Sequence, residues 1–289
     1  MVASLIDDYQ SNGFAAPIEV MSPDDAGGYA GRLESLASRY ADELAVHRYL
    51  RYDPHYVLPL ADELMRHPAM LSIASSLLGA DLMVSNTNFF LKEPSSTDFV
   101  SWHQDLHYVG FDGQDYLTVW LALTPATVEN GCMRYLPGSH LHRLSHRDTF
   151  DPQNMLTRGQ VVEPAVDEAH AVDVLLDAGQ ATVHHGQLCH ASHPNRSAGR
   201  RIGFSVRYIA PHMRQVESPR DYGVLVSGED RYGRFERPVP PSTDFAASAL
   251  TQYESIMADR RRILYHGTDA AQAAAPRLPG LEAHSNQSV

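Results

Sequence analysis

The chain has 289 residues, and its 23 lysine and arginine residues against 35 aspartate and glutamate residues give a formal net charge of −12. This length accommodates one large domain or two small ones with a sizeable core. The acidic balance argues against nucleic acid or an anionic membrane as a partner. No run approaches the roughly 20 apolar residues that a membrane-spanning helix requires.

The cysteine content indicates a reducing compartment. Cys132 and Cys189 are the two cysteines of the chain, too few for a disulfide framework. Asp7 and Asp8 lie where a secretory signal would need an apolar core. We therefore expect a cytoplasmic protein.

The first 80 residues are predicted to be mainly helical. Ser22 can cap a helix that Pro23 begins, and apolar residues continue at helical spacing to about residue 44. A second helical stretch covers about 58–78 and is interrupted at Pro68.

The pattern then changes to short β-rich runs separated by turn signals. These runs cover residues 82–92, 115–123, 132–136, 171–175, 180–185 and 201–209. Helices followed by many short strands predict a mainly β fold with flanking helices, namely a sandwich or jelly roll.

We expect a single domain over 1–265. Its helical part is 1–80, its jelly-roll core 81–210, and its C-terminal extension 211–265, with a helix over 243–265. The polar stretch 141–160 has no clear periodicity, so it is a loop long enough to be a lid, although an ordinary surface insertion fits as well. Residues 266–289 are rich in alanine, proline and serine and are expected to form a flexible tail.

A possible metal site lies in the stretch "SWHQDLHYVG" at 101–110. His103 and Asp105 are two positions apart, so on a strand their side chains share one face. The run "QATVHHGQLCH" at 180–190 offers His184, His185 and His190 as a second imidazole. Two histidines and one carboxylate that leave open coordination positions are typical of non-haem Fe(II) oxygenases.

The strand after these histidines begins with two arginines. A 2-oxo acid that chelates such an iron needs a cation for its far carboxylate, and an arginine provides two parallel hydrogen bonds. Strand alternation sends Arg200 and Arg201 to opposite faces. Arg201 shares its face with Gly203, Ser205 and Arg207, and small residues there suit a ligand-filled interior.

The segment "FLKEPSSTDFVSWHQDLHYVGF", the later "NGCMRYLPGSH" and "HHGQLCHASHPNRSAGRRIGFSVRY" together resemble the phytanoyl-CoA dioxygenase family of Fe(II)/2-oxoglutarate oxygenases. The resemblance covers roughly 85–210 and implies a double-stranded β-helix, a jelly roll flanked by helices. It implies Fe(II), 2-oxoglutarate and O2 as cofactors. It also makes His103, Asp105 and His190 the iron ligands and Arg201 the partner of the 2-oxoglutarate carboxylate.

The resemblance further places Asn86 and Trp120 at positions that contact 2-oxoglutarate in some members. A related halogenase branch replaces the metal-binding aspartate with a small residue, so the presence of Asp105 favours hydroxylation, desaturation or a related oxidation over halogenation. Residues that follow the metal motif or share strand parity with Asn86 are candidates to line a substrate pocket: Asn88, Phe90, His107, Tyr108 and Phe111.

The sequence thus predicts a dioxygenase that hydroxylates an unactivated C–H bond of a small molecule, such as a natural-product or amino-acid-derived intermediate. An acyl-CoA is a second possible substrate, with Arg143, Arg147, Arg214 and Arg220 as possible phosphate partners. A cupin-like metalloprotein that ignores 2-oxoglutarate and a binding protein without catalysis are also compatible with these motifs. The sequence carries no prediction of oligomeric state.

Overall fold

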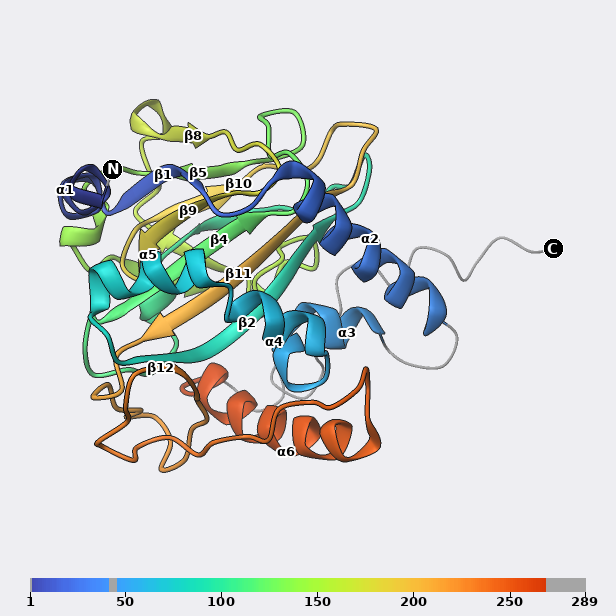
Figure 1. The fold of residues 1–289 in the computed structure, drawn as a ribbon. Helices are drawn as coiled ribbons and strands as arrows, with labels where there is room; N and C mark the ends of the chain where they lie inside the picture. The colour runs from blue at the N-terminus through green and yellow to red at the C-terminus, as the bar shows by residue number, and fades with distance from the viewer. Residues whose placement is uncertain (1, 42–45, 269–289) are drawn as a thin grey trace.

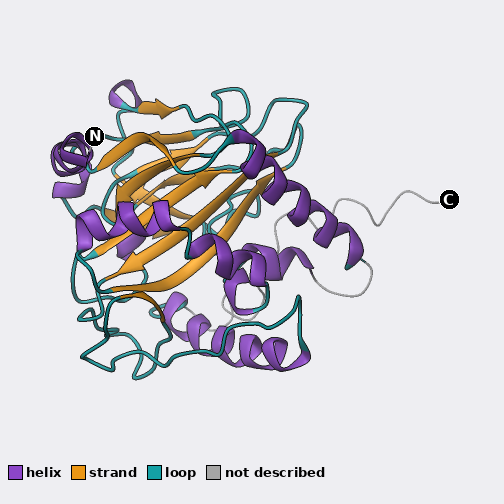
Figure 2. Ribbon diagram, in the orientation of Figure 1, coloured by secondary structure: helices purple, strands orange, loops and turns teal. Residues whose placement is uncertain are grey.

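Two antiparallel sheets form the centre of the computed structural model, which describes residues 2–41 and 46–268 (Figures 1 and 2). The larger sheet has the strand order β1-β9-β4-β11-β2-β12 and the smaller one β3-β10-β5-β8. The bounds in the larger sheet are β1 Phe14–Glu19, β9 Gln180–His185, β4 Tyr116–Ala122, β11 Arg201–Ile209, β2 Leu82–Lys92 and β12 Val224–Ser227. Those in the smaller sheet are β3 Val100–His103, β10 His190–Ser192, β5 Met133–Tyr135 and β8 Val172–Val174.

The helices are α1 Val2–Asn12, α2 Pro23–Arg39, α3 Val46–Arg51, α4 Pro59–Met65, α5 Pro68–Leu78 and α6 Ala247–Leu264. In Figure 1, α4 and α5 lie across one face of the larger sheet, and α6 lies beyond the β12 edge. The Ser22 hydroxyl accepts a hydrogen bond from the Asp25 amide at 3.1 Å, which confirms the predicted helix start. The predicted interruption at Pro68 is the boundary between α4 and α5.

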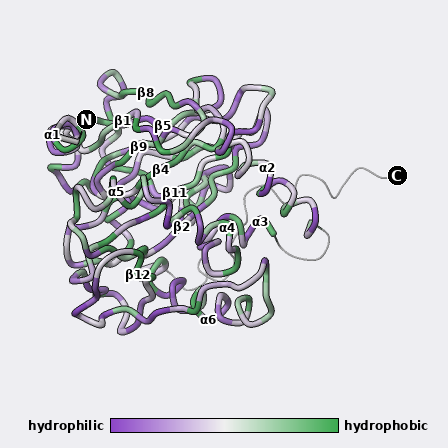
Figure 3. Tube along the Cα trace, in the orientation of Figure 1, coloured by the Kyte–Doolittle hydropathy of each residue, from purple (hydrophilic) through white to green (hydrophobic). Residues whose placement is uncertain are grey.

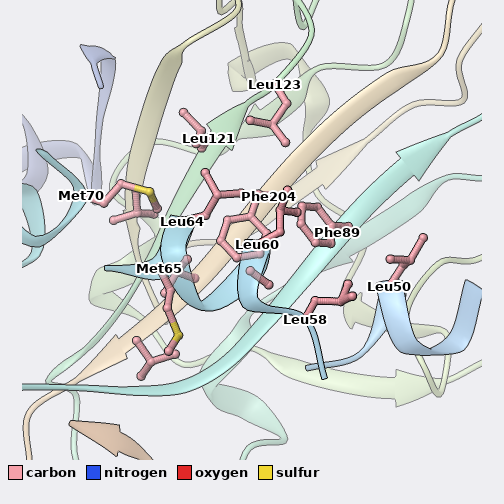
Figure 4. Close-up of a cluster of buried hydrophobic side chains, with 14 of the residues drawn as sticks. Leu50, Leu58, Leu60, Leu64, Met65, Met70, Phe89, Leu121, Leu123 and Phe204 are labelled. Atoms are coloured by element: carbon pink, nitrogen blue, oxygen red, sulfur yellow. The ribbon is translucent and has the colours of Figure 1, made fainter. Parts of the chain in front are cut away.

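The main core lies between this helical layer and the larger sheet. Ile202, Phe204 and Val206 of β11 point into it and are at most 1% exposed. Phe204 packs on Phe89 of β2 with ring centroids 4.6 Å apart, and Leu60 and Leu64 of α4 belong to the same cluster (Figure 4). Each such side chain contributes about 1.5–3 kcal/mol through burial. The strands at the centre of the sheet are largely hydrophobic, whereas much of the peripheral chain is hydrophilic (Figure 3).

The opposite face of β11 points toward the smaller sheet. A Cβ on Gly203 would lie 1.9 Å from the Trp120 ring, so the indole fills the space over this glycine. The expectation that the small residues of this face leave room for a ligand is therefore wrong at Gly203. A glycine is required there because the neighbouring strand's indole lies against its backbone.

Several elements differ from the sequence prediction. β1 contains Pro17, which hides its strand pattern, yet proline is tolerated because β1 is an edge strand. The stretch 141–160 is not wholly a loop, since β6 Ser145–Asp148 pairs with β7 Gln160–Glu163. The predicted helix from Ser22 ends at Arg39, residues 42–45 lie outside the described residues, and so does most of the predicted tail. None of the described helices has the length and hydropathy needed to cross a membrane.

Candidate metal centre

His103 and His190 are neighbours across the smaller sheet. His103 ends β3, His190 begins β10, and the two residues are paired in register. Their ring centroids lie 4.0 Å apart. The chain then turns into a short 3-10 helix at Asp105–His107, which brings Asp105 Oδ1 to 3.4 Å from His103 Nε2 and 4.0 Å from His190 Nε2. One ligand atom from each residue lies within 4.8 Å of the others, and all three residues are buried.

Hydrogen bonds to backbone carbonyls orient both imidazoles. Nδ1 of His103 lies 2.9 Å from the Ser101 carbonyl and 3.1 Å from that of His190. Nδ1 of His190 lies 2.9 Å from the Leu188 carbonyl. A carbonyl can only accept, so Nδ1 carries the proton and the Nε2 lone pair faces Asp105. This is the usual support of a metal-ligating histidine.

The two oxygens of Asp105 have different neighbours. Thr118 Oγ1 donates to Oδ2 at 3.0 Å, and Arg207 Nε lies 3.6 Å from the same oxygen. Burial by itself raises the pKa of Asp105, but Arg207 and the imidazoles around the carboxyl group lower that pKa well below its usual value. The carboxylate is therefore ionised, with Oδ1 directed at the histidines.

The run 180–190 is not one strand, because a turn separates β9 from β10. Strand alternation sends His184 and His185 at the end of β9 to opposite faces, so only one of them can face the candidate ligands. It is His184 that lies beside the centre, with Nε2 3.8 Å from Asp105 Oδ2 and Nδ1 2.9 Å from the Tyr135 hydroxyl. His185 packs instead on His140 and Tyr9.

A small cavity joins His103 and His190 to Arg201 and Trp120, while Asp105 lines the adjoining larger cavity. Arg201 is 1% exposed, and its guanidinium lies 5.3 Å from the centre of the Trp120 ring. It donates one hydrogen bond to the Gly131 carbonyl. Two buried donors, Arg201 Nε and Trp120 Nε1, have no acceptor among the described residues. A carboxylate in this cavity would provide the missing acceptors.

Lys92 lies next to Arg201 and is fully buried. Its amine donates to Ser192 Oγ at 2.7 Å and to the His193 carbonyl. Burial, with the nearby Arg201 charge, lowers the pKa of Lys92 to about 5. The amine is thus neutral at pH 7, and Arg201 carries the positive charge of this end of the cavity.

A second cavity of about 130 Å³ adjoins the first, since Phe90 and Arg207 line both. Four of the five predicted substrate residues line it, namely Asn88, Phe90, Tyr108 and Phe111. Asn86 lines it as well. Asn86 therefore lies in this cavity, where its amide donates to Asn88 Oδ1 at 3.3 Å, and does not line the cavity of Arg201. His107 lines neither cavity and stacks on His146 with centroids 3.9 Å apart.

A family model described as phytanoyl-CoA dioxygenase (PhyH) matches residues 9–203, two thirds of the chain. The chain belongs to the phytanoyl-CoA dioxygenase family. This confirms the resemblance found in the sequence, and the double-sheet structure confirms the predicted jelly-roll fold of that family.

Known members of the family and its fold include several oxygenases. The solved structure of the non-heme monooxygenase ThoJ is 37% identical, with a TM-score of 0.80, and the match covers 90% of this chain and 97% of that one. A probable alpha-ketoglutarate-dependent hypophosphite dioxygenase of Stutzerimonas stutzeri is 29% identical over 61% of this chain and 63% of the relative. The 1-deoxypentalenic acid 11-beta-hydroxylase of Streptomyces exfoliatus is 27% identical over 57% of this chain and 59% of the relative. The chain thus spans less than two thirds of these curated relatives' length.

The predicted cofactors agree with these findings. Iron(II) prefers the two imidazoles and one carboxylate that His103, His190 and Asp105 present, and the unpaired donors of Arg201 and Trp120 fit 2-oxoglutarate. The structure of CytC3 with Fe(II) and alpha-ketoglutarate, 21% identical, has the same fold with a TM-score of 0.62.

Sequence reasoning did not assign three arginines that line the second cavity. Arg207 could have been found, because strand alternation already put it on the face of Arg201. Arg51 lies in the helical part and Arg260 in α6, beyond the family match, and no local motif marks either residue.

Proposed function

We propose that this chain is an Fe(II)/2-oxoglutarate-dependent oxygenase that hydroxylates an unactivated C–H bond of a small organic molecule. The observation that carries the proposal is the buried cluster of His103, Asp105 and His190, whose two histidines share a small cavity with Arg201. Arg201 Nε lacks an acceptor among the described residues. The family match and the hydroxylase and dioxygenase relatives support it.

The iron with its co-substrate supplies the oxidising chemistry. The roles of the chain follow from its geometry. His103, His190 and Asp105 Oδ1 would hold the iron. Arg201 and Trp120 would bind the far carboxylate of 2-oxoglutarate and fix its orientation. Thr118 keeps Asp105 Oδ2 occupied, so the carboxylate offers the metal a single oxygen.

The second cavity is proposed to bind the substrate, since it reaches Asp105 and is lined largely by apolar and aromatic side chains. The geometry does not favour an acyl-CoA. Of its possible phosphate partners, Arg214 pairs with Asp112 at 3.0 Å, and Arg220 pairs with Glu236 at 2.5 Å. A natural-product or amino-acid-derived substrate remains our proposal.

The test is an anaerobic titration of the Fe(II)-loaded protein with 2-oxoglutarate, followed by the visible metal-to-ligand charge-transfer band. We expect the band in the wild-type protein. In Arg201→Met, the 2-oxoglutarate affinity should fall by roughly 30-fold or more, because loss of one partner of a buried charge pair costs about 2–5 kcal/mol.

Arg200→Met is the matched control. Arg200 is the neighbouring residue, and it pairs with Glu93 at 2.8 Å on the surface. Its loss should leave the titration unchanged. Absence of the band in wild-type protein with confirmed iron binding would overturn the proposal and favour a metalloprotein that does not use 2-oxoglutarate.

A cytoplasmic setting is also proposed. Cys132 and Cys189 are both buried free thiols, as expected in a reducing compartment. Burial raises the pKa of the Cys132 thiol to about 11 and that of Cys189 to about 12, so neither is a reactive thiolate at pH 7.

A further inference from the structure

The three arginines that line the second cavity differ in their acidic partners. Arg260 lies 2.5 Å from Asp53 and 3.8 Å from Asp221. Arg207 lies 3.6 Å from Asp105. Arg51, by contrast, has no carboxylate within ion-pair distance among the described residues, and its guanidinium donates to the Met155 carbonyl.

The position of Arg51 is fixed by its surroundings. It ends α3, and its carbonyl accepts a 2.6 Å hydrogen bond from the Asn88 side chain. Its guanidinium lies 4.8 Å from the centre of the Phe90 ring, which lines both cavities. Burial lowers the pKa of Arg51, but a guanidinium remains charged at neutral pH. Arg51 is partly buried and has no acidic partner within ion-pair distance among the described residues, so it can pair with an anion in the cavity.

Part of the wall that the C-terminal extension contributes is apolar, although Gln215, Asp221 and Arg260 also line the cavity. Met257, Ile263 and Leu264 of α6 line it together with Met155 and Leu156. A dry cavity of similar size, about 150 Å³, holds a benzene molecule in another protein. The space therefore suits an apolar fragment of about the size of a phenyl ring, with Arg51 among the lining residues.

We propose that the second cavity binds a substrate with one carboxylate that pairs with Arg51 and an apolar fragment that contacts α6. This rests on the proposed oxygenase function and narrows its substrate class. The 2-oxoglutarate carboxylate is a different anion, because Arg201 and Trp120 line the first cavity and Arg51 does not. An acidic protein with a net charge of −12 thus offers an anion a local cation at this point.

The probes are 3-phenylpropionate and its neutral amide, 3-phenylpropanamide. Binding of each is measured by calorimetry to Fe(II)-loaded protein saturated with 2-oxoglutarate in the absence of O2. We expect the carboxylate to bind about tenfold or more tightly than the amide, since a charge-assisted pair is lost with the amide. Arg51→Met should remove this preference and leave the 2-oxoglutarate affinity within about twofold.

Two further variants keep the test decisive. Arg51→Lys retains the charge and should retain part of the preference even if the methionine variant folds poorly. Arg231→Met is the matched control, because Arg231 is 72% exposed and lies on the surface with Glu229. It should keep the full preference.

The outcomes separate this inference from the proposed function. No preference in the wild-type protein, or a preference that survives Arg51→Met, would overturn the inference. A tenfold loss of 2-oxoglutarate affinity in Arg51→Met with unchanged probe binding would assign Arg51 to the co-substrate and also overturn it. If the protein prefers the carboxylate but shows no charge-transfer band with 2-oxoglutarate, the carboxylate site stands and the oxygenase proposal fails.

Discussion

Arg201 and Arg260 are both buried arginines, yet their electrostatic settings are opposite. Arg260 has Asp53 and Asp221 beside it, and it also donates to the Tyr222 carbonyl at 3.0 Å. Arg201 has no carboxylate within ion-pair distance among the described residues, and one of its donors lacks an acceptor. The role of a buried arginine is thus indicated by its partners: Arg260 is satisfied within the protein and holds α6, whereas Arg201 is poised for a ligand.

The largest effect on activity is expected from replacing His103, a candidate metal ligand that lines the same cavity as Arg201. His103→Ala removes one of three ligand atoms and should abolish 2-oxoglutarate-dependent succinate release, because the remaining pair cannot hold iron in this geometry. Succinate release at saturating iron and 2-oxoglutarate is the measurement. His170→Ala is the control, since His170 is 76% exposed near Asp167. Wild-type turnover by the His103 variant would remove His103 from the ligand set.

The next largest effect, on the stability of the fold, is expected from replacing Arg260. Arg260→Met leaves Asp53 and Asp221 buried without their cation, and loss of one partner of a buried ion pair costs about 3–5 kcal/mol. We expect that loss in the free energy of unfolding, measured by urea denaturation. Arg262→Met on the same helix is the control, because Arg262 is 75% exposed. If Arg260→Met reduced 2-oxoglutarate affinity without destabilising the protein, the contrast with Arg201 would be wrong.

A smaller effect is expected at His184, which touches the metal centre without belonging to the candidate ligand set. Nε2 of His184 has no hydrogen-bond partner in the part of the chain that the structure describes and lies 3.8 Å from Asp105 Oδ2, and we propose that His184 helps to position that carboxylate. Loss of such support reduces metal affinity by about 10–100-fold. We expect this from His184→Phe in an iron titration, with a shifted charge-transfer band that a purely structural role would not produce. His185→Phe, on the neighbouring position, should leave both unchanged.

The sequence predicts the metal site better than it predicts the second cavity. The spacing of His103 and Asp105 and the six predicted strands are local patterns that could be read directly. The choice of His190 and Arg201 came from the resemblance to the family. The sequence could not show which of His184 and His185 lies beside the metal centre. The turn between β9 and β10 breaks the strand alternation that would relate these two residues to His190.

The second cavity could be predicted only in part. Asn88, Phe90, Tyr108 and Phe111 follow local patterns and were found. Arg51, Met155 and the α6 residues are far apart in sequence, and tertiary packing alone brings them together. The pairing of Arg260 with Asp53 spans 207 positions, and no spacing rule reaches that far. Whether an arginine has an acidic partner is therefore a property of the fold.

Lys92 beside Arg201 is expected to make the stability of the protein depend on pH. The pKa of Lys92 is lowered from 10.5 to about 5 by burial, so between these values the unfolded chain binds a proton that the folded chain does not. Stability must then rise with pH across this window, by at most about 1.4 kcal/mol per pH unit for one proton. Lys92→Met lacks this contribution and loses the bond to Ser192, a loss that we take as independent of pH between about 6 and 9.

The measurement is the difference in free energy of unfolding between wild type and Lys92→Met from about pH 6 to 9, in which most other titrations cancel. It should shift in favour of the wild type as pH rises. Parallel profiles would mean that the amine stays protonated in the folded protein. Arg201 would then be one of two cations at this end of the cavity, and the carboxylate of 2-oxoglutarate would meet both.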